Sequence, residues 1–343
     1  MQLAALALLL GCDPSPASTD APAPDAVAID AIDPIGIDAP PPAWESVEEV
    51  SRSGGVIVER VGYRSDGLLI FAKQCRPDDT ARHAIVVYNH GGFAGLAPDS
   101  ETARCEMTAQ LGYVWLGSSY RGEDRSEGTV EVCLGEVDDV LAMIRIGAAQ
   151  PYATGDVGMY GASHGGCITQ RALQRGAPVK VAIDIFGPTD WTSLYAYWQA
   201  RGSSADQQLM SVLETATGGT PATKPDEYAK RSPINFVAAF PASVPLLVTH
   251  GTNDAIVPVV QSCNLAMPAM LSSYHVSSQG MELATPPTTC EQTPVPSNAT
   301  PRPSPAWPMN RYLVIYDGMN HEFTSVSAQR MLQDAATFLM AKL

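Results

Sequence analysis

Short apolar runs alternate with helix-length segments from about residue 55 to the end of the chain. Eight runs have the length and composition of strands: 56–61, 68–73, 83–89, 113–118, 157–160, 179–186, 244–250 and 312–316. The interior runs are continuously apolar, as expected of strands that are buried on both faces. Helical patterns fall between the runs, at about 100–111, 135–149, 164–175, 259–271 and 325–342. This alternation predicts an α/β fold whose mostly parallel sheet of about eight strands has helices on both faces.

Two segments within residues 51–343, the expected catalytic domain, interrupt this alternation. Residues 190–240 carry Trp191, Tyr195 and Trp198 at helical spacing, followed by Gly, Thr and Pro residues that are typical of turns. This pattern predicts a small helical cap. We expect the three aromatic side chains to line the substrate pocket, although an aromatic stripe at this spacing is also typical of ordinary core. The other segment, 272–310, is a Pro-rich insertion.

The N-terminal 50 residues differ from the rest of the chain. Residues 1–12 contain a short apolar run that is too short to span a bilayer as a helix and that fits a signal segment. It ends in Leu-Leu-Gly-Cys, which resembles the lipobox of bacterial lipoproteins and makes Cys12 the expected lipidation site. Residues 13–50 hold nine acidic residues, eight prolines and no Lys or Arg, and they predict an extended, disordered tether. The alternative is a frayed N-terminus on a soluble protein.

The charge balance narrows the choice of partners. The chain has 21 Lys and Arg residues against 36 Asp and Glu residues, which gives a formal net charge of −15. Nucleic-acid binding relies on Lys and Arg to neutralise phosphates, so this composition disfavours it. We expect a small-molecule ester or a short peptide as the substrate, and membrane attachment only through a lipidated Cys12.

The motif Gly161-Ala162-Ser163-His164-Gly165 satisfies the pattern G-x-S-x-G. It follows the apolar run 157–160 and precedes a helical pattern, and this strand, sharp turn and helix would present the hydroxyl of Ser163 at the edge of the sheet. The context therefore predicts that Ser163 is a catalytic nucleophile.

A serine nucleophile needs a base and an orienting acid. His321 directly follows the last predicted strand and is the best candidate for the base. Asp254 follows the run 244–250 and lies where a carboxylate could orient the imidazole, while Asp190 is a rival for this role.

An oxyanion hole requires backbone N–H groups close to the nucleophile. The run 83–89 is followed by His90-Gly91-Gly92-Phe93, and we expect the N–H groups of Gly92 and His164 to be the donors, with Gly91 and Phe93 as alternatives. We interpret His83, His250 and His275 as structural. The sequence contains no His or Cys pair with zinc-ligand spacing and no phosphate-binding loop, so we expect no metal and no cofactor.

Apart from Cys12, six cysteines remain, an even number that suits an exported protein with disulfide bonds. We predict a bridge between Cys263 and Cys290 that would fix the Pro-rich insertion near the site. The alternatives are that Cys290 pairs with another cysteine or stays free. For Cys167, which lies on the helix after Ser163, a free core thiol is the favoured interpretation.

These motifs, taken in order, resemble the catalytic domain of the prolyl oligopeptidase and dienelactone hydrolase branch of the α/β-hydrolases. The resemblance covers about residues 55–343 and rests on His90-Gly91-Gly92, Tyr120-Arg121-Gly122, Gly161-Ala162-Ser163-His164-Gly165-Gly166, Gly187-Pro188-Thr189-Asp190-Trp191, His250-Gly251, Asp254, Val257-Pro258 and Asn320-His321. It implies the α/β-hydrolase fold, the triad order Ser163, Asp254, His321, and hydrolysis of esters or amides through an acyl-enzyme.

The expected activity is that of an exported or lipid-anchored serine hydrolase of the bacterial cell envelope, which cleaves a carboxylic ester. Peptidases of the prolyl oligopeptidase type carry an N-terminal propeller, which the short N-terminal segment here cannot form, so a dipeptidyl or acyl-aminoacyl peptidase is the alternative. A third possibility is a catalytically silent envelope protein that uses the fold to bind a ligand.

Overall fold

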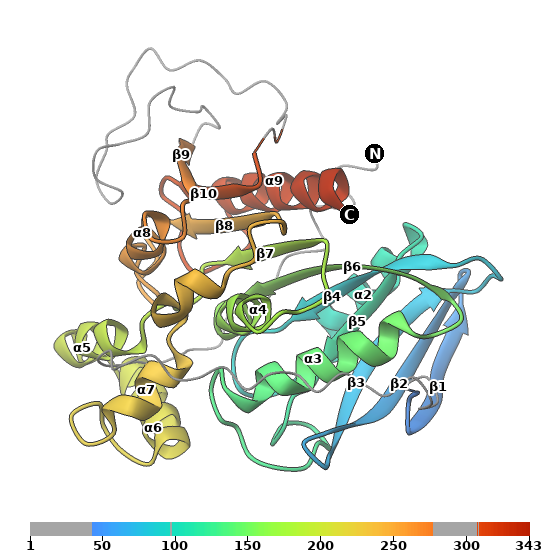
Figure 1. Cartoon of the computed structure of the whole chain (residues 1–343), viewed down its shortest axis with the longest axis horizontal. Helices are drawn as coiled ribbons and strands as arrows, with labels where there is room; N and C mark the ends of the chain where they lie inside the picture. The colour runs from blue at the N-terminus through green and yellow to red at the C-terminus, as the bar shows by residue number, and fades with distance from the viewer. Residues whose placement is uncertain (1–42, 97, 277–306, 308) are drawn as a thin grey trace.

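The structure, a computed structural model, describes residues 43–96, 98–276, 307 and 309–343 (Figure 1). In these residues one sheet has the strand order β1-β2-β3-β5-β4-β6-β7-β8-β10-β9. The pairs β1–β2, β2–β3 and β3–β5 are antiparallel, and the pairs from β5 to β9 are parallel. The strands are β1 (Ser46–Ser53), β2 (Val56–Ser65), β3 (Leu68–Pro77), β4 (His83–Asn89), β5 (Val114–Ser118), β6 (Ala153–Ala162), β7 (Val181–Ile185), β8 (Leu246–Gly251), β9 (Ser272–Val276) and β10 (Arg311–Tyr316).

Helices cover both faces of this sheet (Figure 1). One buried cluster joins alternate strand residues to α3 and α4, and a second joins the other alternate residues to α2 and α9. Every residue of β5, β7 and β8 is buried, which explains their mostly apolar sequences. The helices are α2 (Pro98–Gln110), α3 (Gly135–Ala148), α4 (His164–Gln174), α5 (Trp191–Arg201), α6 (Ser204–Thr217), α7 (Pro225–Arg231), the 3-10 helix η1 (Pro233–Ala239), α8 (Val260–Ala266) and α9 (Val326–Lys342).

The sequence-based fold class is confirmed, but the strand count of about eight was too low, because β1 and β9 were not predicted. The edge strand β1 is exposed along its whole length and contains Glu48, Glu49 and Arg52, a composition that protects an edge from further pairing but hides the strand in the sequence. It also moves the end of the predicted tether: the tether was expected to reach residue 50, whereas β1 begins at Ser46. The strand β9 lies inside the predicted Pro-rich insertion.

Residues 191–239 form α5, α6, α7 and η1, which lie together at one side of the sheet (Figure 1). The helix α5 begins after Asp190, whose side chain accepts a hydrogen bond from the amide of Thr192, and it ends at Gly202. The helix α6 begins with a capping box in which Ser203 and Asp206 exchange hydrogen bonds. Within the described ranges, no helix is both long enough and apolar enough to cross a membrane.

Candidate active site

Ser163 lies at a sharp turn between β6 and α4. Its backbone has φ 55° and ψ −125°, and a residue with a side chain adopts this left-handed region only under strain. Its amide donates to the carbonyl of Ile185 in β7 at 2.9 Å. A Cβ added to Gly161 would meet the carbonyl oxygen of Gly165, and one added to Gly165 would meet that of Asn89. The glycines of G-x-S-x-G are therefore needed for the close approach of strand and helix.

Asp254 and His321 meet at the carboxyl ends of β8 and β10. The His321 Nδ1–H donates to Asp254 Oδ2 at 2.7 Å, and Asp254 Oδ1 accepts the amides of Ile256 at 2.9 Å and Val257 at 2.8 Å. This arrangement fixes the proton on Nδ1 of His321 and leaves Nε2 as the acceptor.

The side chain of Asp254 is buried, but it is charged. Burial favours the neutral acid, yet the charge and hydrogen bond of His321, together with His250 Nε2 at 3.5 Å, outweigh burial and hold the pKa of Asp254 well below its usual range. His250 is itself held between the Ser262 hydroxyl and the Val257 carbonyl, each at 2.7 Å, in agreement with its structural interpretation.

The imidazole of His321 packs against the ring of Phe186, with 4.3 Å between the ring centroids. Phe186 directly follows β7, the strand whose Ile185 carbonyl accepts the Ser163 amide. Among the described residues, no hydrogen bond joins the Ser163 hydroxyl to His321. Hydrogen bonds between a nucleophile and its base are often long without substrate and tighten when substrate binds.

The side chain of His164 joins the loop after β4 to the segment before α3. Its Nε2 accepts the amide of Cys133 at 2.9 Å, so its Nδ1 carries the proton and donates to the Gly92 carbonyl at 3.2 Å. Burial lowers the pKa of His164 to about 4, and the ring is therefore neutral at pH 7. Phe93 packs on the same ring at 4.7 Å, and Gly92 has φ 72°. The predicted oxyanion residues thus lie in one connected group.

A buried pair, Glu123 and His90, supports the same loop and was not identified from the sequence. Glu123 Oε2 accepts the amide of Gly95 and lies 3.4 Å from His90 Nε2. Tyr120 stacks on the His90 ring at 4.1 Å. Burial raises the pKa of Glu123 to about 9, with Glu136 and Asp124 acting in the same direction, and burial lowers the pKa of His90 to about 4. Both groups are therefore neutral at pH 7, with the carboxyl protonated.

A disulfide between Cys133 and Cys167 joins α4 to the segment before α3. The expectation of a free core thiol at Cys167 was wrong, because Cys133 approaches it from a segment 34 positions away. Cys75 and Cys105 form another disulfide, which joins β3 to α2.

Cys263 is also disulfide-bonded. Cys290 lies outside the described residues, so the pairing of Cys263 with Cys290 stays a prediction, as does any role of Cys12. Bridges from Cys290 to Cys75, Cys105 or Cys133 are ruled out, because these three are already paired.

The aromatic side chains proposed to line the pocket belong to the core instead. Trp191 is 1% exposed and Trp198 is 0% exposed, and their indole N–H groups donate to backbone carbonyls. The Tyr195 hydroxyl donates to Glu214 at 3.0 Å. The prediction of a substrate-lining stripe was wrong, because the helical spacing places all three residues on the face of α5 that packs inward.

The rival acid, Asp190, caps α5 rather than orienting a histidine. Arg121 of the Tyr-Arg-Gly motif lies in a buried ion-pair network, where it contacts Asp139 at 2.8 Å and Glu131 at 2.9 Å. Across the residues that the structure describes, no group of three or more His, Cys, Asp or Glu side chains is arranged to hold a metal ion.

Solved structures with the same fold include peptidases and esterases. The acylaminoacyl peptidase of Pyrococcus horikoshii superimposes with a TM-score of 0.61 at 18% identity, over 84% of this chain and 42% of that one. The chain thus spans about two fifths of the length of that peptidase. The acetyl xylan esterase of Paenibacillus sp. R4 superimposes with a TM-score of 0.59 at 14% identity, over 87% of this chain and 88% of that one.

Sequence comparison supports the same assignment. An uncharacterized peptidase of Bacillus subtilis, YtmA, is 25% identical over 214 residues, which are 62% of this chain and 79% of that protein. The family model of the X-Pro dipeptidyl-peptidases (S15 family) matches residues 55–239, which include Ser163 but neither Asp254 nor His321. With this match over more than half of its length, the chain belongs to the X-Pro dipeptidyl-peptidase (S15) family of serine hydrolases, within the α/β-hydrolase superfamily.

Proposed function

We propose that this serine hydrolase cleaves a carboxylic ester or an amide, with Ser163 as nucleophile, His321 as base and Asp254 as orienting acid. The observation that carries the proposal is the 2.7 Å hydrogen bond from His321 to Asp254, formed at the sheet edge where the strained turn presents Ser163. Among the other histidine side chains that the structure describes at this edge, none combines a charged carboxylate with an available second nitrogen: His90 and His164 are neutral buried rings, and His250 is bonded through both nitrogens.

The proposed reaction begins when the Ser163 hydroxyl attacks the carbonyl carbon and its proton passes to His321 Nε2. Asp254 stabilises the imidazolium that forms. The N–H groups of His164 and Gly92 are the proposed donors to the oxyanion, and each such donor is typically worth about 10²- to 10³-fold in rate. His321 then protonates the leaving group, and a water molecule activated by the same residue hydrolyses the acyl-enzyme.

Two substrate classes have separate support. An ester is our leading proposal, because the acetyl xylan esterase matches this chain over nearly the full length of both proteins. A dipeptidyl or acyl-aminoacyl peptide is favoured by the S15 family match and by the similarity to a peptidase of Bacillus subtilis. Parallel assays with short acyl p-nitrophenyl esters and with aminoacyl-p-nitroanilides separate the two classes.

The triad assignment is tested with Ser163→Ala, His321→Ala and the double variant. We expect each single change to reduce kcat by about 10⁴- to 10⁶-fold and the double change to cost little more, because the residues act as one unit. His83→Gln, at the opposite end of β4, is the matched control. Additive losses, or wild-type labelling of Ser163→Ala by a fluorophosphonate probe, would refute the assignment. Wild-type protein that is neither labelled nor active would favour a silent binding protein.

We also propose that the protein is exported to the bacterial cell envelope and is anchored there by lipidated Cys12. The Cys75–Cys105 and Cys133–Cys167 disulfides support an oxidising compartment, since such bonds rarely persist in the cytosol. Labelling of cells with a radioactive fatty acid tests the anchor: the wild-type protein should incorporate label in the membrane fraction, and Cys12→Ala should not. Equal incorporation by both would exclude Cys12 as the site.

A further inference from the structure

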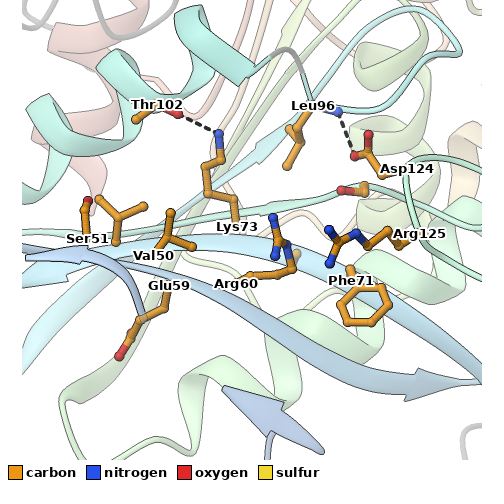
Figure 2. A pocket seen from close by; sticks show the side chains of 13 residues that line it. Val50, Ser51, Glu59, Arg60, Phe71, Lys73, Leu96, Thr102, Asp124 and Arg125 are labelled. Atoms are coloured by element: carbon orange, nitrogen blue, oxygen red, sulfur yellow. Dashed lines mark hydrogen bonds between the residues drawn. The ribbon is translucent and has the colours of Figure 1, made fainter. Parts of the chain in front are cut away.

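A cavity of about 500 Å³ opens between β1, β2, β3 and the N-terminal half of α2 (Figure 2). Arg60 comes from β2 and Lys73 from β3, and the two residues are direct partners across the antiparallel pair. Like charges directly opposite each other destabilise a pair of strands. Arg125, from the loop after β5, is a third cation in the lining. Three cations thus line this cavity in a chain whose net charge is −15.

Two acidic residues, Glu59 and Asp124, also line the cavity. Glu59 points away from the cavity in Figure 2, and its carboxylate is held by Arg76 at 2.9 Å and by Gln74. Asp124 accepts the amide of Leu96 at 3.3 Å, also drawn in Figure 2.

Two of the cations have polar contacts at their tips. Arg60 pairs with the exposed Glu48 at 2.7 Å, and the ammonium of Lys73 donates to the Thr102 hydroxyl at 2.8 Å. The guanidinium of Arg125 makes no hydrogen bond or ion pair with the described residues, and it points into the cavity in Figure 2.

Apolar side chains complete the walls, chiefly Val58, Phe71 and Leu96. Leu96 follows Gly92 by four positions, and Ser119 directly follows β5, so the cavity adjoins the edge that carries Ser163. Three neighbour steps in the sheet separate β3 from β6. Neighbouring strands lie about 4.8 Å apart, so the distance across the sheet from β3 to β6 is roughly 14 Å, which about four extended residues would span.

We propose that this cavity binds the carboxylate of a substrate that also carries an apolar group, such as the C-terminal carboxylate of a short peptide. The guanidinium of Arg125 and the ammonium of Lys73 would contact the carboxylate, and Phe71 and Leu96 the apolar group. Identifying the ligand as a substrate rests on the proposed function, whereas the charge preference of the cavity does not.

The test compares N-acetyl-phenylalanine with N-acetyl-phenylalaninamide, which have the same shape and differ in one charge. Binding is measured by titration calorimetry to the full chain with its disulfides intact. We expect the acid to bind and the amide to bind at least tenfold more weakly. Arg125→Gln and Lys73→Met should each weaken binding of the acid about three- to tenfold without affecting the amide, in the range of partly exposed charged contacts. Added salt should weaken binding of the acid in the same way.

Lys180→Gln is the matched control, because Lys180 is an exposed cation that pairs with Asp156 and does not line the cavity. Equal binding of acid and amide, or an equal loss in Lys180→Gln, would overturn the proposal. Competition by inorganic phosphate as strong as that by the acid would overturn the assignment to a carboxylate. Fluorophosphonate labelling of Ser163 in the same samples tests the proposed function separately. If the protein is labelled but binds acid and amide equally, the cavity proposal is refuted and the proposed function is not.

Discussion

Replacing Glu123 with Gln is expected to raise the free energy of unfolding at neutral pH and to make it depend less on pH. In the folded protein Glu123 is buried beside His90, accepts the amide of Gly95, and has its pKa raised from 4.5 to about 9 by burial. Gln is the neutral isostere of the protonated carboxyl, and its amide oxygen can still accept the Gly95 amide. The side chain at position 123 is therefore neutral at every pH in the Glu123→Gln protein.

The sign follows from proton binding. Between pH 4.5 and about 9 the unfolded chain has lost the Glu123 proton and the folded protein retains it, so stability falls by about 1.4 kcal/mol for each pH unit. From pH 4.5 to pH 7 this amounts to about 3.4 kcal/mol, an upper limit on the gain in the free energy of unfolding from Glu123→Gln at pH 7. Burial also lowers the pKa of His90 from 6.5 to about 4. This shift changes the free energy of unfolding only below about pH 6.5, and it does so in both proteins.

The assay is urea unfolding of both proteins without reductant, at several pH values between about 5.5 and 8.5. The difference in the free energy of unfolding should grow with pH by up to about 1.4 kcal/mol per unit. Glu48→Gln, which removes an exposed carboxylate of β1, controls for the general effect of charge. A difference that is the same at every pH would show that Glu123 is ionised in the folded protein and would refute the reasoning.

Three further changes test other parts of the structure. Asp254→Asn should lower kcat by about 10³- to 10⁴-fold, because it removes the charge that orients His321; an unchanged kcat would contradict the assignment. Replacing Cys133 and Cys167 together with Ser should lower the free energy of unfolding by up to about 4 kcal/mol, measured by urea denaturation. Trp198→Ala should cost about 3–5 kcal/mol and change all substrate rates alike, whereas selective changes across an acyl-chain series would restore the pocket interpretation.

The sequence predicted the parallel part of the sheet well, because strands buried on both faces are continuously apolar. All eight predicted strands are present, at β2, β3, β4, β5, β6, β7, β8 and β10. The two missed strands lie at the edges of the described sheet, where one side of the strand has no neighbour among the described residues and the apolar pattern is weak. The first five residues of β1, Ser-Val-Glu-Glu-Val, were interpreted as tether for this reason.

The sequence could identify the site residues that follow the end of a predicted strand. His321 and Asp254 each follow an apolar run, and the structure brings them within hydrogen-bond distance. The burial of Glu123 could not be predicted, because an acidic residue in a loop is normally exposed, although its position just after β5 was a signal. The Cys133–Cys167 bridge was missed because cysteine pairing depends on tertiary contacts that no sequence spacing encodes.

The two halves of the proposed triad are positioned by different parts of the sheet, and β7 connects them. On one side, the Ile185 carbonyl accepts a hydrogen bond from the amide of Ser163. On the other, the amide of Phe186 donates to the Thr249 carbonyl of β8 at 2.7 Å, and the Phe186 ring packs on His321. The nucleophile is further held by the turn geometry and the nearby disulfide, whereas His321 lies on a loop after β10. Ser163 is therefore held from strand, helix and bridge at once, whereas His321 is held through its hydrogen bond to Asp254 and its packing on Phe186.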